Sequence, residues 1–258
     1  MLSLTVLQIV LAITSGLAVG FSLALVGGGG SILAVPALLY LVGIGDTHVA
    51  IGTAALAVAV NAFANLALHA RSGNVKWPCA AVFAGSGILG AALGAALGKQ
   101  VDGRHLLLLF AAVMVAVGIA MLRPKAAGGD PQVRITAKIA LKLALLGLAA
   151  GLLSGFFGIG GGFLIVPGLM LGSGMPILNA IGSSLFGVGS FGLTTAASYA
   201  WSGLVDWQAA GWFIAGGVLG GLAGSRIATR AARHKGLLNR LFAGLIFAVA
   251  AYVVWRTF

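Results

Sequence analysis

Two clusters of glycine are the residues of this chain whose spacing could do chemistry. The first cluster is Gly27, Gly28, Gly29 and Gly30, followed by Ser31, and the second is Gly158, Gly160, Gly161 and Gly162. A glycine run that opens a helix presents unpaired backbone N–H groups and the positive end of a helix dipole. Two such helix starts that converge could bind an anion without a lysine or arginine, whose charge is costly to bury.

Each cluster precedes a short apolar run that contains a proline, Pro36 in the first run and Pro167 in the second. Proline removes a backbone donor and interrupts the hydrogen-bond ladder of a helix. We therefore expect both prolines to kink these runs and to open backbone carbonyls toward a polar cavity.

Polar side chains in two other apolar runs could assist such a site. Asn61 and Asn65 are one helical turn apart, so they share a face, and Thr53 lies two turns before Asn61 near that face. The corresponding run of the second half carries Ser183 and Ser184. We expect these groups to contact the bound ligand, and hydrogen bonding between helices is the alternative role for each of them.

The sequence has no pattern typical of catalysis or of metal binding. All four acidic residues lie between apolar runs, and they are Asp46, Asp102, Asp130 and Asp206. The four histidines lack metal-ligand spacing, and the first glycine cluster lacks the lysine and the serine or threonine that end a phosphate-binding loop. We expect no enzymatic activity, no metal and no cofactor.

The composition is typical of a membrane protein. Of the 258 residues, 60% are hydrophobic and 7% are charged, whereas about 25% are charged in an average soluble domain. Too few polar side chains are left to cover a surface that faces water. The net charge of +11 fits the basic loops of a membrane protein better than nucleic-acid binding, which we do not expect.

Ten apolar segments account for nearly the whole chain. They lie near residues 4–26, 31–45, 48–70, 78–98, 105–122, 138–157, 162–175, 177–200, 207–225 and 237–255. Each must be helical, because lipid offers no partner to an unpaired backbone group. The segments 31–45 and 162–175 are shorter than the about 20 residues that a span requires. The sequence predicts an all-α polytopic membrane protein and leaves open whether these two segments cross fully or turn back.

Some glycines are expected to serve close helix packing alone. Small residues let membrane helices approach each other closely. In the fourth apolar segment these glycines are Gly85, Gly90, Gly94 and Gly98. Four consecutive glycines are poor helix sequence, so packing explains the first cluster less well.

The chain contains an internal repeat. The sequence GGGGSILAVP at 27–36 parallels GIGGGFLIVP at 158–167, AIGT at 50–53 parallels AIGS at 180–183, and SGNVKW at 72–77 parallels SGLVDW at 202–207. Three matched blocks in one order at nearly one spacing indicate two transmembrane repeats, 1–122 and 138–258. A polar, turn-rich linker at 123–137 joins them.

The basic residues indicate how the segments are oriented. If all ten segments cross, twelve basic residues share one face, and they are Arg71, Lys76, Arg123, Lys125, Arg134, Lys138, Lys142, Arg226, Arg230, Arg233, Lys235 and Arg240. The other face has Lys99, Arg104 and Arg256. The positive-inside rule then makes the face with the linker cytoplasmic. Five crossings per repeat is an odd number, so we expect inverted repeats. Two re-entrant segments would put the second basic cluster outside, which the charge rule disfavours.

The repeated blocks resemble those of the TauE/SafE family, membrane proteins described as sulfite exporters or organosulfonate permeases. The shared pattern is a glycine cluster with an apolar run and proline, then Ala-Ile-Gly-Ser/Thr, then Gly-x-Val-x-Trp, and it covers the chain from about Gly16 onward. The second half fits closely at Gly158–Pro167 and Gly182–Leu185. The first half lacks the apolar residue inside its cluster and the second hydroxyl at Gly52–Ala55. The resemblance implies transport of a small sulfur-containing oxyanion.

Inverted repeats are a common plan of secondary transporters, which hold the substrate near the bilayer midplane between the repeats. We therefore predict an exporter of sulfite or an organosulfonate in the bacterial inner membrane. It would work by alternating access, with the anion bound at the glycine-rich helix starts. Its expected partners are that anion and the lipid bilayer, and the oligomeric state stays open, a homo-oligomer included. The alternatives are a transporter of another small anion or solute, and a membrane assembly subunit that transports nothing.

Overall fold

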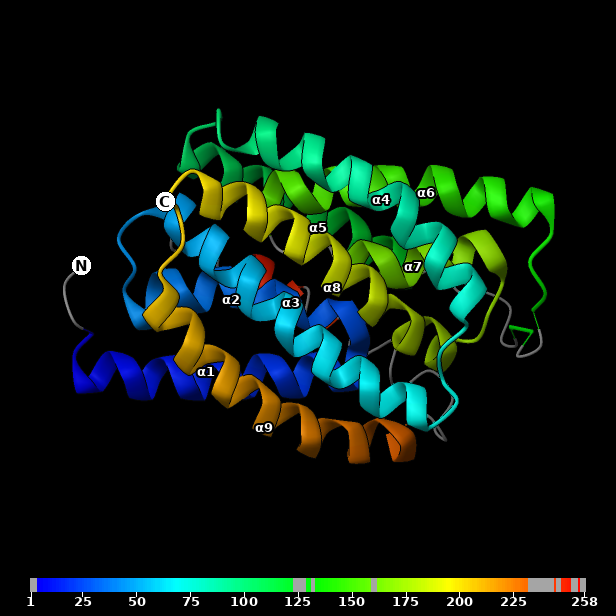
Figure 1. The fold of residues 1–258 in the computed structure, drawn as a ribbon, viewed down its shortest axis with the longest axis horizontal. Coiled ribbons are helices and arrows are strands. Elements are labelled where there is room, and N and C mark those ends of the chain that lie inside the picture. Colours follow the sequence, from blue (N-terminus) through cyan, green and yellow to red (C-terminus); the bar gives the residue numbers. More distant parts are fainter. Residues whose placement is uncertain are drawn as a thin grey trace.

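The computed structural model of the chain describes residues 4–122, 129–130, 133–158, 162–231, 244, 247–251 and 255. Every regular element in these residues is helical, and the long helices run roughly along one axis (Figure 1). In chain order the elements are α1 (Val6–Val26), η1 (Gly27–Leu33), α2 (Ala34–Pro36), η2 (Ala37–Val42), α3 (Thr47–Arg71), α4 (Trp77–Gly98), α5 (Gly103–Leu122), α6 (Ala137–Phe157), α7 (Gly162–Ser173), α8 (Ile177–Trp201) and α9 (Trp207–Ala231). Element η1 is a 3₁₀-helix and η2 is a π-helix. The prediction of an all-helical fold is confirmed.

Five of the described helices, α1, α3, α4, α6 and α8, are long and apolar enough to cross a membrane. Each contains a stretch of 18 residues with at most two charged side chains. The predicted apolar segments up to residue 225 coincide with helical elements, whereas most of the segment 237–255 lies outside the described residues. The chain is a polytopic membrane protein.

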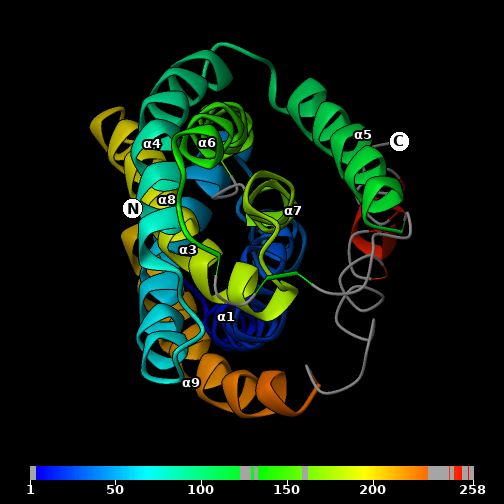
Figure 2. The ribbon, with the colours of Figure 1, turned by 90° about the vertical axis from the view of Figure 1, so that its right-hand side faces the viewer.

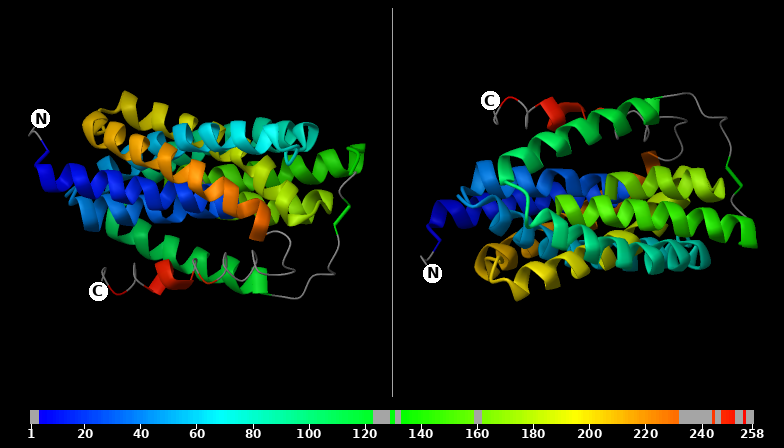
Figure 3. Two further views of the ribbon diagram at one scale, coloured as in Figure 1. Left: turned by 90° about the horizontal axis from the view of Figure 1, so that it is seen from below. Right: turned by 90° about the horizontal axis from the view of Figure 1, so that it is seen from above.

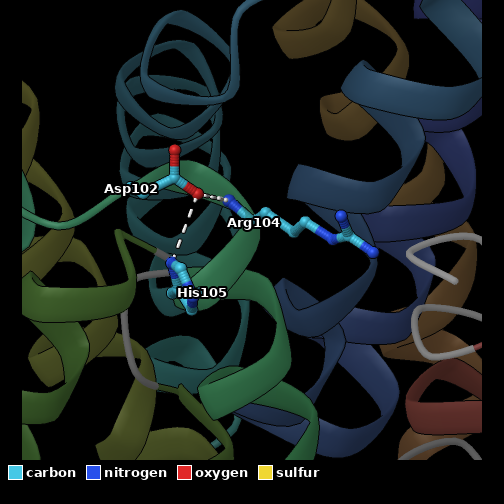
Figure 4. Close-up of polar contacts among 3 residues, drawn as sticks. All are labelled: Asp102, Arg104 and His105. Atoms are coloured by element: carbon cyan, nitrogen blue, oxygen red, sulfur yellow. Dashed lines mark hydrogen bonds and ion pairs between the residues drawn. The ribbon is translucent and has the colours of Figure 1, made fainter.

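Aspartates begin three of the helices. Asp46 Oδ1 accepts two backbone N–H groups from the first turn of α3, at 2.7 and 3.1 Å. Asp206 caps α9 in the same way, and Asp102 accepts the Arg104 N–H at the start of α5 (Figure 4). A carboxylate at a helix N-terminus pairs N–H groups that have no partner within the helix. This role explains why these acidic residues stand between apolar segments.

Helices α3 and α8 pack against each other in the bundle and run antiparallel (Figure 1). The Asp206 N–H, which follows α8, donates to Thr53 Oγ1 in the second turn of α3 at 2.9 Å. The Lys76 N–H, which follows α3, donates to Ser183 Oγ in the second turn of α8 at 2.8 Å. The two bonds therefore join corresponding positions of the two halves in both directions.

Helix α4 packs along α6, and α1 packs along α9. In each pair the facing residue numbers rise together, so the helices run parallel, and an added Cβ would meet backbone atoms of the partner. The glycines at these positions are Gly87, Gly90, Gly94, Gly98, Gly147, Gly151 and Gly155 in the first pair, and Gly16, Gly20, Gly216, Gly220 and Gly224 in the second. The packing role predicted for Gly90, Gly94 and Gly98 is confirmed. For Gly85 the prediction is wrong, because no described atom lies within 4 Å of a Cβ placed there.

The short segment 27–42 runs back along α1, and α7 runs back along α6. Gln8 Nε2, in the first turn of α1, donates to the carbonyl of Val42 at the end of η2, at 3.1 Å. The Asp130 N–H, ahead of α6, donates to the carbonyl of Gly174, which follows α7, at 3.0 Å. A 3₁₀-helix rises about 2.0 Å per residue against about 1.5 Å in an α-helix, so η1 covers more length with fewer residues. Each short segment therefore returns to the level at which the preceding long helix begins.

Helix α5 lies apart from the central helices, as the view along the bundle shows (Figure 2). Residues 247–251 pack beside it, since a Cβ at Gly118 would lie 2.9 Å from the ring of Phe247. In Figure 3 α5 and residues 247–251 lie beside the segment 27–42. Ala248 and Val249 line one side of a cavity, and Leu33 and Pro36 line it from the segment 27–42.

Candidate functional site

The first glycine cluster ends α1 against helix α8. Gly27 has a φ of +66°, a left-handed conformation that side chains rarely adopt, and a Cβ there would lie 2.7 Å from Ser184 Oγ. The Gly28 N–H donates to the same Ser184 oxygen at 3.2 Å. Ser184 in turn donates to the carbonyl of Ile181 at 2.8 Å. The cluster therefore requires glycine at its first position, and its second N–H is already paired.

Helix α3 holds the other side of this break through His69. An uninterrupted α1 would pair the Gly28 N–H with the carbonyl of Ala24, four residues earlier. The Ala24 carbonyl instead contacts His69 Nε2 at 3.0 Å, and both residues are buried. The Ser31 hydroxyl donates to the carbonyl of Gly28 at 2.7 Å. The break is thus held from α3 and from α8 at once.

The second glycine cluster lies near the other end of the α3–α8 pair. Gly158 ends α6 with a φ of +67°, and a Cβ there would meet an isoleucine side chain in the second turn of α3. Gly162 begins α7, and Gly160 and Gly161 lie outside the described residues. Gly27 faces the start of α8, so the antiparallel packing separates it from Gly158. The element η1, which contains the first cluster, nevertheless contacts α7, which begins at Gly162 of the second cluster. Convergence of the two glycine-rich helix starts on a ligand stays a prediction.

The hydroxyls of Thr53, Ser183 and Ser184 are engaged within the protein. Thr53 Oγ1 donates within its own helix at 2.6 Å and accepts the Asp206 N–H. Ser183 accepts the Lys76 N–H, and Ser184 pairs with the glycine break. These bonds hold the two halves together, which is the interhelical role that the sequence left open. Contact with a ligand stays a prediction for all three residues.

Asn61, Asn65 and His69 form a row along one face of α3, each one turn from the next. Asn61 is fully buried, and neither polar atom of its amide has a hydrogen-bond partner among the described residues. The Asn65 amide nitrogen donates to the backbone carbonyl of Asn61 at 3.0 Å, whereas its Oδ1 has no described partner. His69 Nδ1 is buried and likewise unpaired within the described structure. The row therefore offers hydrogen-bonding atoms that the protein itself does not use.

Two glycines of α9 face this row, so they offer no side chain that could pair with it, and on α1 the backbone carbonyl of Gly20 accepts from the Asn65 amide nitrogen at 3.4 Å. A Cβ at Gly217 would meet the amide of Asn61, and a Cβ at Gly221 would meet Oδ1 of Asn65. An unpaired buried polar group costs about 1–3 kcal/mol, so each one in a native structure needs an explanation, such as a function or a bound water or ion. Asn61 is therefore the strongest candidate for a ligand contact in the predicted set, and the contact itself stays a prediction.

His69 lies outside the residues that the sequence pattern selects, because neither an acidic neighbour nor metal-ligand spacing accompanies it. Its position four residues after Asn65 is the signal that places it on the same helix face. The orientation of its ring could not be predicted from this spacing, because it is set by the contact between Nε2 and the Ala24 carbonyl of α1.

The second half has no equivalent row of amides. Phe191, Thr195 and Tyr199 take the corresponding positions on α8. The ring of Phe191 lies beside Gly87, where the first half places the Asn61 amide beside Gly217. The Thr195 and Tyr199 hydroxyls are buried and have no partner within the part of the chain that the structure describes. The amide donors of the candidate site therefore come from the first half alone.

An apolar cavity of about 380 Å³ lies beside the first short segment. Leu33, Pro36, Ala248 and Val249 are among its lining residues, and Ser15 contributes a hydroxyl. The polar cavity expected beside Pro36 is wrong, because the surrounding side chains of α1 and of the C-terminal residues are almost all aliphatic. Such a cavity does not suit an anion, so the candidate site lies at the row on α3.

Comparison with known proteins identifies relatives over nearly the whole chain. The family model described as "Sulfite exporter TauE/SafE" matches residues 12–253. A "Probable membrane transporter protein" of Xylella fastidiosa strain Temecula1 is 51% identical over 255 residues, 98% of each chain. The "Probable membrane transporter protein YdhB" of Bacillus subtilis is 28% identical over 198 residues, 74% of this chain and 77% of its own length. No solved structure matches the chain.

The family match covers both glycine clusters and the row on α3. It agrees with the resemblance of the repeated blocks and with five helices that are long and apolar enough to cross a membrane. The relatives named above are described as membrane transporters. The chain therefore belongs to the TauE/SafE sulfite exporter family of membrane transporters.

Proposed function

We propose that the protein exports a small sulfur-containing oxyanion, such as sulfite or an organosulfonate, across the bacterial inner membrane. The description of the family as sulfite exporters supports this substrate class and this direction. The buried amide of Asn61 is the observation that carries the proposal. Its Nδ2 is a hydrogen-bond donor with no described partner, and the oxygens of an oxyanion accept hydrogen bonds from such donors.

The proposed anion site is the Asn61–Asn65 face of α3. Backbone N–H groups of the glycine-rich segments are proposed as further donors on the transport path, where η1 and α7 contact each other. Amides and backbone groups carry no formal charge, so binding needs no lysine or arginine inside the bilayer. Thr53, Ser183 and Ser184 support the site through the bonds that join the halves.

The two halves are proposed to be inverted repeats that move against each other. The antiparallel α3 and α8 and the reciprocal bonds of Thr53 and Ser183 support this symmetry. An exchange of the halves also turns the α4–α6 pair into the α9–α1 pair, and both pairs are parallel and packed through glycine. Rocking of one half against the other would open the site to each side in turn.

The membrane potential is proposed to drive export. We place the linker and the basic loops in the cytoplasm by the positive-inside rule. A negative cell interior then favours outward movement of an anion by about 2.3 kcal/mol per charge per 100 mV. The four aspartates lie outside the described helices, so the mechanism involves no carboxylate there.

Flux measurements with purified protein in liposomes test this proposal. Sulfite movement is followed under an imposed membrane potential, with sulfate, thiosulfate and a small organosulfonate as competitors. Saturable flux that follows the potential is the expected result, and the order of competition defines the substrate class. If folded protein moves none of these anions, the proposal is wrong.

A membrane assembly subunit that transports nothing is the second candidate, because close packing of the α4–α6 and α1–α9 pairs already accounts for many of the glycines. The two functions differ in anion binding. A ligand that binds the folded state raises its thermal stability, so sulfite should stabilise a transporter in detergent. A subunit without an anion site would show no such rise with any of the four anions.

A further inference from the structure

His69 is a buried titratable group that the proposed mechanism leaves without a role. Only 2% of the residue is exposed, and its Nε2 lies 3.0 Å from the carbonyl oxygen of Ala24. A carbonyl only accepts hydrogen bonds, so Nε2 carries the hydrogen and Nδ1 carries the lone pair. Nδ1 has no hydrogen-bond partner among the residues described. A proton can therefore bind Nδ1 without breaking a bond that this histidine makes.

The unpaired nitrogen belongs to the same row as the proposed anion contacts. Asn65 Oδ1 is unpaired one turn before His69, and the Asn61 amide is unpaired one turn before that, within the described residues. All three side chains face α1 and α9, where they approach Ala24, Gly221 and Gly217. His69 therefore lies two helical turns, about 12 Å along the helix axis, from the Asn61 donor.

The charged side chains near this end of α3 are basic. Arg71 ends α3, Lys76 precedes α4, and Arg226 lies in the last turns of α9. Helix α1, which contacts the histidine directly, carries no charged residue. The three basic side chains are exposed or half-buried. None of them can form an ion pair with a protonated histidine, because all of them are cations.

Cys79, at the start of α4, is a further titratable group near this end of α3, and the carboxylates and the other titratable groups around α3 lie at its opposite end. They are Asp46, Asp102, Asp206, Tyr40, His48 and Tyr199. The remaining acid, Asp130, is exposed in the linker. A proton on His69 would therefore create a positive charge with no carboxylate beside it in the described structure. A bound anion would supply the missing negative charge.

We propose that His69 takes up one proton with each anion, so that one proton and one anion cross together. This inference rests on the proposed function of the Asn61 site. A proton from water forms the Nδ1–H bond as the anion enters, and the same bond breaks when the anion leaves. The Asn61 amide donates to the anion, and the imidazolium two turns along the same helix face offsets the anion's charge.

Coupling of this kind has two measurable consequences. Because the linkage is reciprocal, the anion concentration for half-saturation falls by up to about tenfold for each unit by which the pH is lowered. The transported charge also changes. A doubly charged oxyanion crosses with one net negative charge and is still driven outward by the potential, whereas a singly charged anion crosses without net charge. The proton therefore selects doubly charged oxyanions as the cargo that the potential exports.

The test measures reversal potentials of thiosulfate flux in liposomes, with and without a pH gradient. Thiosulfate is the probe because it keeps its charge near neutral pH. The variant His69→Gln retains an amide donor for the Ala24 carbonyl but cannot take up a proton. The control is His105→Gln, since the His105 side chain is 75% exposed and pairs with Asp102 at 3.5 Å on the surface (Figure 4).

Wild type and His105→Gln are expected to shift their reversal potential with the pH gradient as one proton per thiosulfate requires. His69→Gln should show no shift, and its half-saturation should change by less than about twofold per pH unit. The inference is overturned by a wild-type reversal potential that ignores the pH gradient, or by an unchanged shift in His69→Gln. If that variant does not fold, the wild-type measurement still decides, and His69→Asn provides the second variant. Folded wild type that moves neither thiosulfate nor sulfite would overturn the proposed function itself.

Discussion

Asn61, Asn65 and His69 place unpaired polar atoms on one face of a helix, opposite glycines of two other helices. Such a face opposes folding, because each buried group without a partner loses its hydrogen bonds to water. Natural proteins break local rules of this kind mainly where function requires it. Thr53 and Ser183 differ, since the hydroxyl oxygen of each accepts a backbone N–H from the other half. The two kinds of residue should respond oppositely to substitution.

Replacement of Asn61 by leucine should raise stability. Asn61→Leu removes two unpaired polar atoms from a fully buried site and puts an apolar side chain of similar size in their place. The expected gain is about 1–3 kcal/mol in the free energy of unfolding. Thermal unfolding in detergent, followed by tryptophan fluorescence, measures it against wild type. A lower midpoint temperature would show that the amide is paired in the folded protein.

Replacement of the hydroxyls should lower stability without changing substrate affinity. Thr53→Ala and Ser183→Ala each leave a backbone N–H without its partner, at an expected loss of about 1 kcal/mol. The same unfolding assay measures the loss, and sulfite flux gives the half-saturating concentration. Ser72→Ala is the control, since this exposed hydroxyl bonds within its own helix. A raised half-saturation with unchanged stability would instead make these hydroxyls substrate contacts.

The positions of the helices could be predicted from the sequence, because each apolar run must be helical in lipid. The partners of individual side chains could not. The bond between Gly28 and Ser184 joins residues 156 positions apart, and no local pattern specifies it. Ser184 accepts the Gly28 N–H, and His69 contacts the Ala24 carbonyl. Both contacts depend on α1 ending at Gly27, because an uninterrupted helix would pair these two backbone groups with each other. The separation of Gly27 from Gly158 likewise depends on the antiparallel packing of α3 and α8.

Two glycines on α4 separate packing from helix propensity. Gly94→Ala adds a Cβ that would meet the backbone of Leu152 on α6, whereas Gly85→Ala adds one with no described atom within 4 Å. Alanine favours a helix over glycine by about 1 kcal/mol at either position. Gly85→Ala should therefore keep or raise the unfolding temperature in detergent, and Gly94→Ala should lower it or prevent folding. Equal unfolding temperatures of the two variants would mean that α4 and α6 are not closely packed at Gly94.

At the scale of the whole molecule, the contacts between helices keep their pattern when the two halves are exchanged. The loops that follow α3 and α8 lie at opposite ends of this antiparallel pair, although their sequences, SGNVKW and SGLVDW, correspond. If the repeats are inverted, corresponding loops face opposite sides of the membrane. This relation gives a direct test of topology.

Cysteine labelling in cells can make that test. The single native cysteine, Cys79, is buried, and Cys79→Ala gives a background without thiols. Ser72→Cys and Ser202→Cys then introduce thiols at exposed, corresponding positions. A membrane-impermeant maleimide should label Ser202→Cys in intact cells and Ser72→Cys only after the membrane is opened. Labelling of both from one side would exclude inverted repeats.

Transport through the Asn61 site is tested most directly by comparing sulfite flux between wild type and Asn61→Leu. Liposomes with equal amounts of folded protein are given the same imposed potential. Wild type is predicted to move sulfite in a saturable way that follows the potential. Asn61→Leu is predicted to move it at least about tenfold more slowly at low sulfite, because a hydrogen bond to a charged ligand contributes about 1.5–3 kcal/mol. Equal flux in the two proteins would contradict a role of this amide in anion transport.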